Sequence, residues 1–207
     1  MVRTEAGLER VRMRREELLK VGKPILFNTD MVRAILAGRK TATRRIVDID
    51  ISNCFDVERD GTVIAYINPE SGDSYEPTEI FRYQTGDILY VRETWDNLPV
   101  NPDGTYCGYN KYYYRADGDM RPEGWKGSWK PSIHMSKEAA RIFLKVTDVR
   151  VEQLQEIDDK GVLEEGLEIG EPFDELWDST CKKNLQVYGW DANPWVWVIE
   201  FERVVEE

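Results

Sequence analysis

Alternating apolar and polar residues predict several β-strands along the chain. The clearest is GDILYVRETW at 86–95, in which Leu89, Val91, Glu93 and Trp95 fall on one face. Both faces of this segment are largely apolar, as in a central strand of a sheet. Other strands are predicted at 23–27, 40–47, 62–67, 109–115, 140–154 and 194–204.

Helical spacing of apolar residues predicts short helices between these strands. Residues 28–38 have the pattern of a helix that Asn28 or Thr29 caps and that Gly38 ends. Further helices are predicted at 156–167 and 171–183. Many β-segments with a few short helices predict an α+β fold built on a small, strongly bent sheet or barrel.

A helix is also predicted ahead of this domain, at residues 4–20, with an apolar stripe formed by Leu8, Val11 and Leu18. Two interpretations are open. The helix packs on the domain or on a partner subunit, giving a homo-oligomer, or it is a solvated surface helix. The predicted organisation is a helical extension at 1–22 and a domain at 23–207, with insertions around 50–80 and 96–130.

The composition is that of an ordinary globular protein, with 207 residues, 41% hydrophobic residues and 32% charged residues. No apolar run approaches the roughly 20 residues that a membrane span needs, so no membrane association is predicted. The N-terminus has no apolar signal segment. The three cysteines are far apart and show no metal-site spacing. A cytoplasmic protein, in the host cell if phage-encoded, is the simplest expectation.

The charge is unevenly spread. The net charge is −11, yet residues 1–47 carry +7 and the rest of the chain carries −18. An acidic bulk argues against a protein that coats nucleic acid, whereas a basic front permits a local site for an anionic ligand. The segment GRKTATRR at 38–45 concentrates this charge in Arg39, Lys40, Arg44 and Arg45.

Common cofactor motifs are missing from the sequence. It contains no GxxxxGK[ST] motif of nucleoside triphosphatases, no GxGxxG motif of dinucleotide-binding enzymes and no GxSxG motif of α/β-hydrolases. The sequence therefore gives no support to these three enzyme classes. We predict no cofactor. His134 is the only histidine and has no HxH or HxxxH partner, so no metal site is predicted. It is either a structural residue or a ligand contact in a loop.

Lys40 and Thr43 have the chemistry of a base and a nucleophile. A threonine hydroxyl attacks only when a base takes its proton, and a lysine accepts that proton only if its pKa is lowered. Neighbouring arginines would lower it. In a regular strand, however, the two residues have opposite parity, so a shared site requires a bulge or a loop here. The alternative is a basic surface strand paired with acidic side chains elsewhere.

The order of several segments resembles the ASCH domain, a PUA-like β-barrel family. The resemblance covers about 23–204 and is carried by GRKTATRR, GDILYVRETW, the run LKVTDVRVEQLQEI with the later EEG, and the closing NPWVWVIEFE. It is closest to the longer phage and prophage versions, which also carry a segment like WKPSIHM and AARI at 129–142. It implies a curved barrel with a cleft that accepts RNA, nucleotides or modified bases.

The resemblance also implies a chemistry, because some small bacterial members remove the acyl group from the exocyclic amine of acetylcytidine. Their lysine, threonine and glutamate correspond to Lys40, Thr43 and Glu165, although Glu164 is an alternative to Glu165. Arg39, Arg44, Arg45, Glu93, Trp95, Trp129 and His134 are predicted to bind the ligand. Glu93, on an apolar face, is expected to pair with Lys40 or an arginine of 39–45. Trp95 and Trp129 are expected to stack on bases, whereas Trp195 and Trp197, which alternate on one strand face, are expected to belong to the core.

Three functions follow from this sequence. The first is a domain that binds RNA, single-stranded nucleic acid or a modified nucleoside. The second is a hydrolase of that family, either an amidohydrolase with Thr43 as nucleophile, Lys40 as base and Glu165 (or Glu93) as acid or orienter, or a ribonuclease. The third is a phage-type interaction protein that uses its N-terminal helix.

Overall fold

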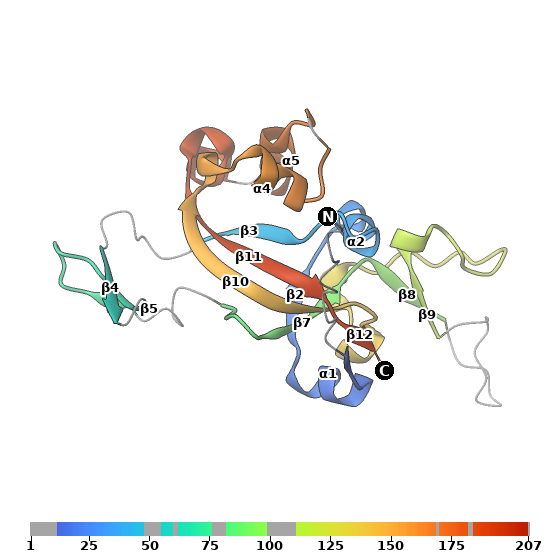
Figure 1. Cartoon of the computed structure of the whole chain (residues 1–207). Coiled ribbons are helices and arrows are strands. Elements are labelled where there is room, and N and C mark those ends of the chain that lie inside the picture. Colours follow the sequence, from blue (N-terminus) through green and yellow to red (C-terminus); the bar gives the residue numbers. More distant parts are fainter. Residues whose placement is uncertain are drawn as a thin grey trace, which may run out of the picture. The chain divides into compact units, whose positions relative to one another are not determined.

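The computed structural model describes residues 12–47, 55–59, 62–75, 82–98, 111–168, 170–181 and 184–206. These fall into two compact units, each formed by segments far apart in the sequence. The first contains residues 1–33, 87–145 and 202–207, and the second contains residues 34–86 and 146–201. A mixed five-stranded sheet has the order β2-β7-β10-β11-β3, and its strands β10 and β11 contribute residues to both units (Figure 1).

In the first unit, β7 (Ile88–Arg92) is the central strand. It runs parallel to β2 (Lys23–Leu26) and antiparallel to the start of β10 (Phe143–Gln153). Leu89 and Val91, predicted to share a face, are 0% and 1% exposed. The core also holds Leu18 of α1 (Arg15–Val21). The remaining elements are β1 (Arg12–Met13), β12 (Val205–Glu206), β8 (Trp95–Asn97) and β9 (Tyr112–Tyr114), with 3-10 turns at 115–117, 132–134 and 137–139.

In the second unit, β3 (Ala42–Ile46) pairs antiparallel with β11 (Trp195–Arg203), and Thr43 lies opposite Ile199. The second unit has a small core of Leu154, Phe173, Trp177 and Val196. Its helices are α4 (Asp159–Glu164), α5 (Phe173–Cys181) and α6 (Leu185–Tyr188), with 3-10 turns at 154–156 and 190–192. A separate antiparallel sheet contains β4 (Phe55–Arg59), β5 (Thr62–Ile67) and β6 (Ser74–Tyr75).

Helix α2 (Thr29–Leu36) connects β2 to the segment that carries Lys40. Asn28 caps it as predicted, because its Oδ1 accepts a hydrogen bond from the Met31 amide at 2.8 Å. Gly38 follows with a φ of 74°, the left-handed conformation that a glycine adopts at little cost after a helix.

The α+β fold class is confirmed, with a five-stranded mixed sheet and few helices. The helix predicted at 4–20 is wrong at its centre, because Arg12 and Met13 form a strand and the helix begins only at Arg15. Leu18 is 0% exposed and packs in the core of the first unit, while Leu8 and Val11 lie outside the described residues, so the partner subunit remains a prediction. The division at residue 22 remains a prediction.

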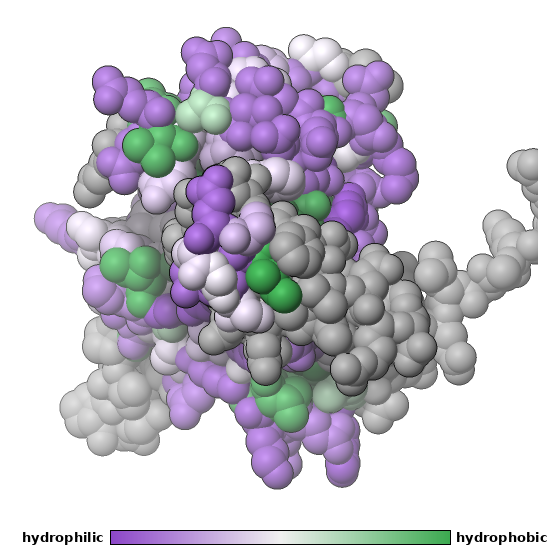
Figure 2. Space-filling model, turned by 90° about the vertical axis from the view of Figure 1, so that its left-hand side faces the viewer, coloured by the Kyte–Doolittle hydropathy of each residue, from purple (hydrophilic) through white to green (hydrophobic). Residues whose placement is uncertain are grey.

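Among the described residues, no helix is long and apolar enough to cross a membrane. On the face drawn in Figure 2, the coloured hydrophobic residues are scattered among hydrophilic ones rather than gathered in one patch. Scattered apolar residues of this kind are normal on a protein surface and do not by themselves indicate an interaction site.

Candidate active site

Lys40 lies in the connection between α2 and β3, before the strand begins at Ala42. The strand predicted at 40–47 is therefore shorter than expected. This difference removes the parity conflict, because strand alternation does not apply to a residue that precedes the strand. Lys40 lies in the connection ahead of the strand, and Thr43 is the second residue of the strand.

The side chain of Lys40 is buried, with 0% exposed. Its Nζ donates to Glu165 Oε2 at 2.5 Å and to the Glu165 carbonyl oxygen at 3.1 Å. Burial lowers the pKa of Lys40, because a charged ammonium loses its hydration there, and Arg45 and Arg44 add to the effect. The Glu165 carboxylate opposes this shift in pKa. A lysine with a lowered pKa is what general-base catalysis near neutral pH needs.

Glu165 joins this lysine to the β3 strand. Its Oε1 accepts a hydrogen bond at 2.7 Å from the amide nitrogen of the peptide between Thr43 and Arg44. That amide is available because β3 is an edge strand, and the bonds from Phe201 to Thr41 and from Val47 to Trp195 set alternate amides toward β11. One carboxylate thus bridges the Lys40 side chain and the backbone beside Thr43.

The segment after α4 lies against residues 39–41 through backbone contacts. The Thr41 amide donates to the Glu164 carbonyl at 2.8 Å, and Arg39 Nη1 donates to the Gly166 carbonyl at 2.5 Å. The two candidate glutamates also differ in their side-chain partners and in how exposed they are. Glu164 pairs with Lys160, whose side chain is 75% exposed, whereas the Glu165 side chain is 4% exposed and reaches Lys40.

Gly166 makes this close approach possible. Its φ is 94°, and a Cβ added to it would lie 2.8 Å from Ala34 Cβ and 2.9 Å from Lys40 Cβ. No side chain larger than hydrogen fits there without moving the segment. The glycine after Glu165 is therefore required by both its backbone conformation and its surroundings.

Replacing Gly166 by Ala is expected to lower the free energy of unfolding by about 2–4 kcal/mol, combining the left-handed conformation with overpacking. Gly170→Ala is a matched control, since Gly170 has a φ of 90° but nothing within 4 Å of the added Cβ. The free energy of unfolding of the control should fall only by the cost of the left-handed conformation, about 1–2 kcal/mol. Urea unfolding of both variants measures the difference, and equal losses would show that the contacts around Gly166 contribute nothing.

Much of the basic segment is paired internally. Arg44 is buried, and its Nε and Nη2 donate to Glu152 Oε1 at 2.8 and 2.6 Å. Its guanidinium also lies over the Phe173 ring at 6.0 Å, and its Nη1 is 3.4 Å from Glu165 Oε1. This pairing neutralises Arg44, and its predicted role in ligand binding remains a prediction. Glu152, which holds Arg44, was missed because an acidic residue in a strand carries no motif.

Thr43 is 1% exposed and shares its strand face with Arg45. Arg45 is half-buried, and burial lowers its pKa. It lies opposite Trp197, whose ring stacks on Tyr83 with the centroids 5.4 Å apart. Trp197 was predicted to belong to the core and is 6% exposed.

The other predicted ligand residues belong to the first unit. Glu93 is 1% exposed, and its carboxylate accepts hydrogen bonds at 2.9 and 3.0 Å from Arg141, a partner that no sequence pattern indicates. Burial raises the pKa of Glu93, and Arg141 opposes that change. The expected pairing of Glu93 with segment 39–45 remains a prediction.

The aromatic residues and the histidine have different environments. Trp95 is buried in the core of the first unit, 5.8 Å from the Tyr112 ring. Trp129 is half-buried under the Arg121 guanidinium at 4.0 Å. His134 is exposed at the end of a 3-10 turn. Within the described ranges, no group of three or more His, Cys, Asp or Glu residues is placed to hold a metal ion.

The arrangement that the second unit brings together is thus a buried lysine, a carboxylate that binds it, and the backbone amide of Arg44, which the same carboxylate binds directly after Thr43. Comparisons of the chain with family models, with curated proteins and with solved structures found no match.

Proposed function

We propose that this chain is an ASCH-type, PUA-like domain that hydrolyses the amide bond on the exocyclic amine of an acylated cytidine-type nucleoside. One observation carries the proposal. The buried Lys40, whose pKa burial lowers, is bound by Glu165, and Glu165 also binds the peptide that follows Thr43. The proposal assigns Thr43 the role of nucleophile, Lys40 the role of base and Glu165 the role of the residue that positions the base.

The proposed reaction has two steps. Lys40 Nζ, in its neutral form, takes the proton of the Thr43 hydroxyl as Oγ1 attacks the acyl carbonyl carbon. The carbon–nitrogen bond then breaks, and the exocyclic amine leaves with the proton that Lys40 returns. In the second step Lys40 takes a proton from water, the water oxygen attacks the threonine ester, and the carboxylic acid is released as Thr43 regains its proton.

Glu165 is proposed to position Lys40 rather than to transfer protons. Both of its oxygens already accept hydrogen bonds, from Lys40 and from Arg44. By holding the Lys40 amine it fixes the direction of the base, as the third member of a catalytic triad does.

A small nucleoside suits this site better than a long RNA. Arg44 is neutralised by Glu152, and Arg39 donates to a backbone carbonyl, so these cations already have partners inside the chain. Tight binding of a long chain would need many unpaired cations against phosphates. Binding of a modified nucleoside without hydrolysis is the alternative function, and the same experiment separates the two.

The test measures hydrolysis of 4-acetylcytidine and other acylated nucleosides by the wild type and by Thr43→Ala. Turnover in the wild type that is lost in the folded variant supports the proposal. Saturable binding without turnover would replace the hydrolase by a binding protein, and neither binding nor turnover of any acylated nucleoside would reject both functions.

A further inference from the structure

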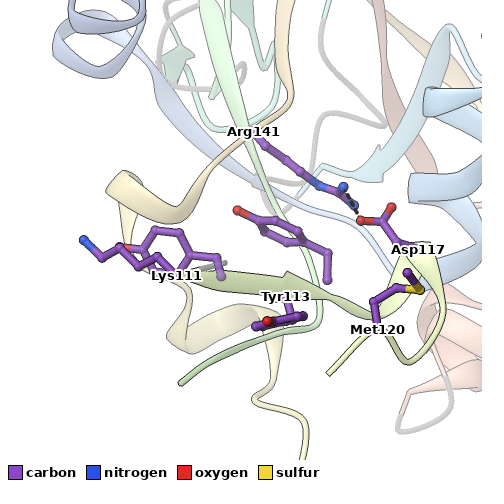
Figure 3. A pocket seen from close by; sticks show the side chains of 7 residues that line it. Lys111, Tyr113, Asp117, Met120 and Arg141 are labelled. Carbon is purple, nitrogen blue, oxygen red and sulfur yellow. Dashed lines mark hydrogen bonds and ion pairs between the residues drawn. The ribbon is translucent and has the colours of Figure 1, made fainter. Parts of the chain in front are cut away.

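A second candidate site lies in the first unit, independent of the proposed hydrolysis. It is a pocket of about 590 Å³, a volume within the range of small-molecule sites. Its walls come from β9, from the turn that follows β9, and from Arg141 (Figure 3). Residues 112–114 supply three consecutive tyrosines, and Met120, 71% exposed, adds a thioether.

Arg141 presents a flat surface rather than an anion-binding fork. Its Nε and Nη2 are bound to Glu93, and its Nη1 donates to Asp117 Oδ2 at 2.6 Å. Each of its three guanidinium nitrogens thus donates a hydrogen bond to a carboxylate. Its guanidinium plane lies over the Tyr114 ring at 3.9 Å. A ligand here meets a stacked guanidinium and tyrosine, which favours a planar ring over a phosphate.

The aromatic wall is held in place by the surrounding structure. The Tyr114 hydroxyl donates to the Ala139 carbonyl at 2.6 Å, Tyr112 packs on Trp95, and Tyr113 is 4% exposed. A wall fixed in this way loses little side-chain entropy when a ring stacks on it, and base stacking on such surfaces contributes about 1–3 kcal/mol per base.

The two ends of the pocket differ in charge. Figure 3 shows Lys111 at one end and Asp117 with Met120 at the other. The Lys111 ammonium lies 5.0 Å from the Tyr112 ring centre, and the Asp117 side chain is 42% exposed. A ligand that matches this pocket therefore has a flat ring with a hydrogen-bond donor on one side, which binds Asp117, and an anionic group on the other side, which binds Lys111.

We propose that this pocket binds a nucleotide. The base stacks on the tyrosine wall, its amino group donates to Asp117, and its phosphate lies beside Lys111. Cytosine, adenine and guanine carry such an amino group, whereas uracil does not. The same chemistry is offered by a free nucleotide and by a nucleotide within a single strand.

The test uses isothermal titration of the full chain with cytidine monophosphate, uridine monophosphate, cytidine and inorganic phosphate. Cytidine monophosphate should bind about tenfold or more tightly than uridine monophosphate, the factor expected for one hydrogen bond to a charged group. Asp117→Ala should remove that preference. Lys111→Ala should weaken cytidine monophosphate and leave cytidine unchanged, while Lys126→Ala, an exposed lysine outside the pocket, should change nothing.

A single-stranded oligocytidine that binds more tightly than the monophosphate identifies a nucleic acid chain as the natural ligand, and equal affinity identifies the free nucleotide. If cytidine monophosphate still binds to Lys40→Met, this pocket is distinct from the proposed hydrolase site. The proposal is overturned if the folded wild type binds none of the nucleotides, if inorganic phosphate binds as tightly as cytidine monophosphate, or if binding survives unchanged in both pocket variants.

Discussion

Replacing Lys40 by Met is expected to lower kcat/KM for an acylated cytidine by about 10²–10⁴-fold, the usual contribution of a general base. Methionine has a similar length and no charge, so it fills the buried space but cannot accept the threonine proton. Glu165 keeps its bonds to the Arg44 amide and guanidinium, which offsets part of the stability lost with its Lys40 partner. Acetate release measured under saturating and limiting substrate gives both kcat and KM.

Two comparisons make this result specific. Lys160→Met removes an exposed lysine of α4 and should leave the rate unchanged. The double variant Lys40→Met with Thr43→Ala should be no slower than the worse single variant, because a base and its nucleophile act as one unit. Losses that multiply in the double variant would contradict a shared step.

Removing the Glu165 carboxylate has the largest expected effect on stability. Glu165→Leu leaves Lys40 and the Arg44 amide without their buried acceptor, and breaking a buried ion pair typically costs about 3–5 kcal/mol. The adjacent Glu164→Leu is the matched control. Its partner Lys160 is largely exposed, so the loss should be only about 0–1 kcal/mol. Chemical denaturation of both variants at neutral pH gives the comparison, and similar losses would contradict the buried bridge.

The pH dependence of Glu165→Gln adds a further check. The carboxylate raises the pKa of Lys40 against the effect of burial, so its removal lowers the folded pKa further. In the unfolded chain the lysine has its ordinary pKa of about 10.4 and binds its proton more readily than in the fold. The free energy of unfolding therefore begins to rise with pH at a lower pH in the variant than in the wild type. The difference in free energy of unfolding between the two should narrow between the folded Lys40 pKa of the variant and that of the wild type.

Local patterns in the sequence predicted most of the regular elements. The alternation in 86–95 and 194–204 corresponds to β7 and β11, and Asn28 and Gly38 bound α2 as their residue types suggest. The strand β4 was missed because its five residues contain only two apolar positions, Phe55 and Val57, which is a short and weak alternation.

The candidate site was only partly predictable. The resemblance pointed to Lys40, Thr43 and Glu165, but periodicity alone placed the first two on opposite faces. What decides their arrangement is where β3 begins, and that depends on contacts with residues 164–166, more than a hundred positions away. The partners Glu152 and Arg141 depend on strand register and tertiary packing, which single-sequence patterns do not specify.

The most direct test of the proposed Lys40 mechanism is the pH dependence of kcat/KM for 4-acetylcytidine hydrolysis in the wild type and in Glu165→Gln. We predict that the rate rises with pH and levels off at an apparent pKa below the ordinary lysine value of about 10.4, and that Glu165→Gln moves this pKa to lower pH. A rate that does not depend on pH, an apparent pKa that Glu165→Gln leaves unchanged or raises, or no hydrolysis at any pH would contradict it.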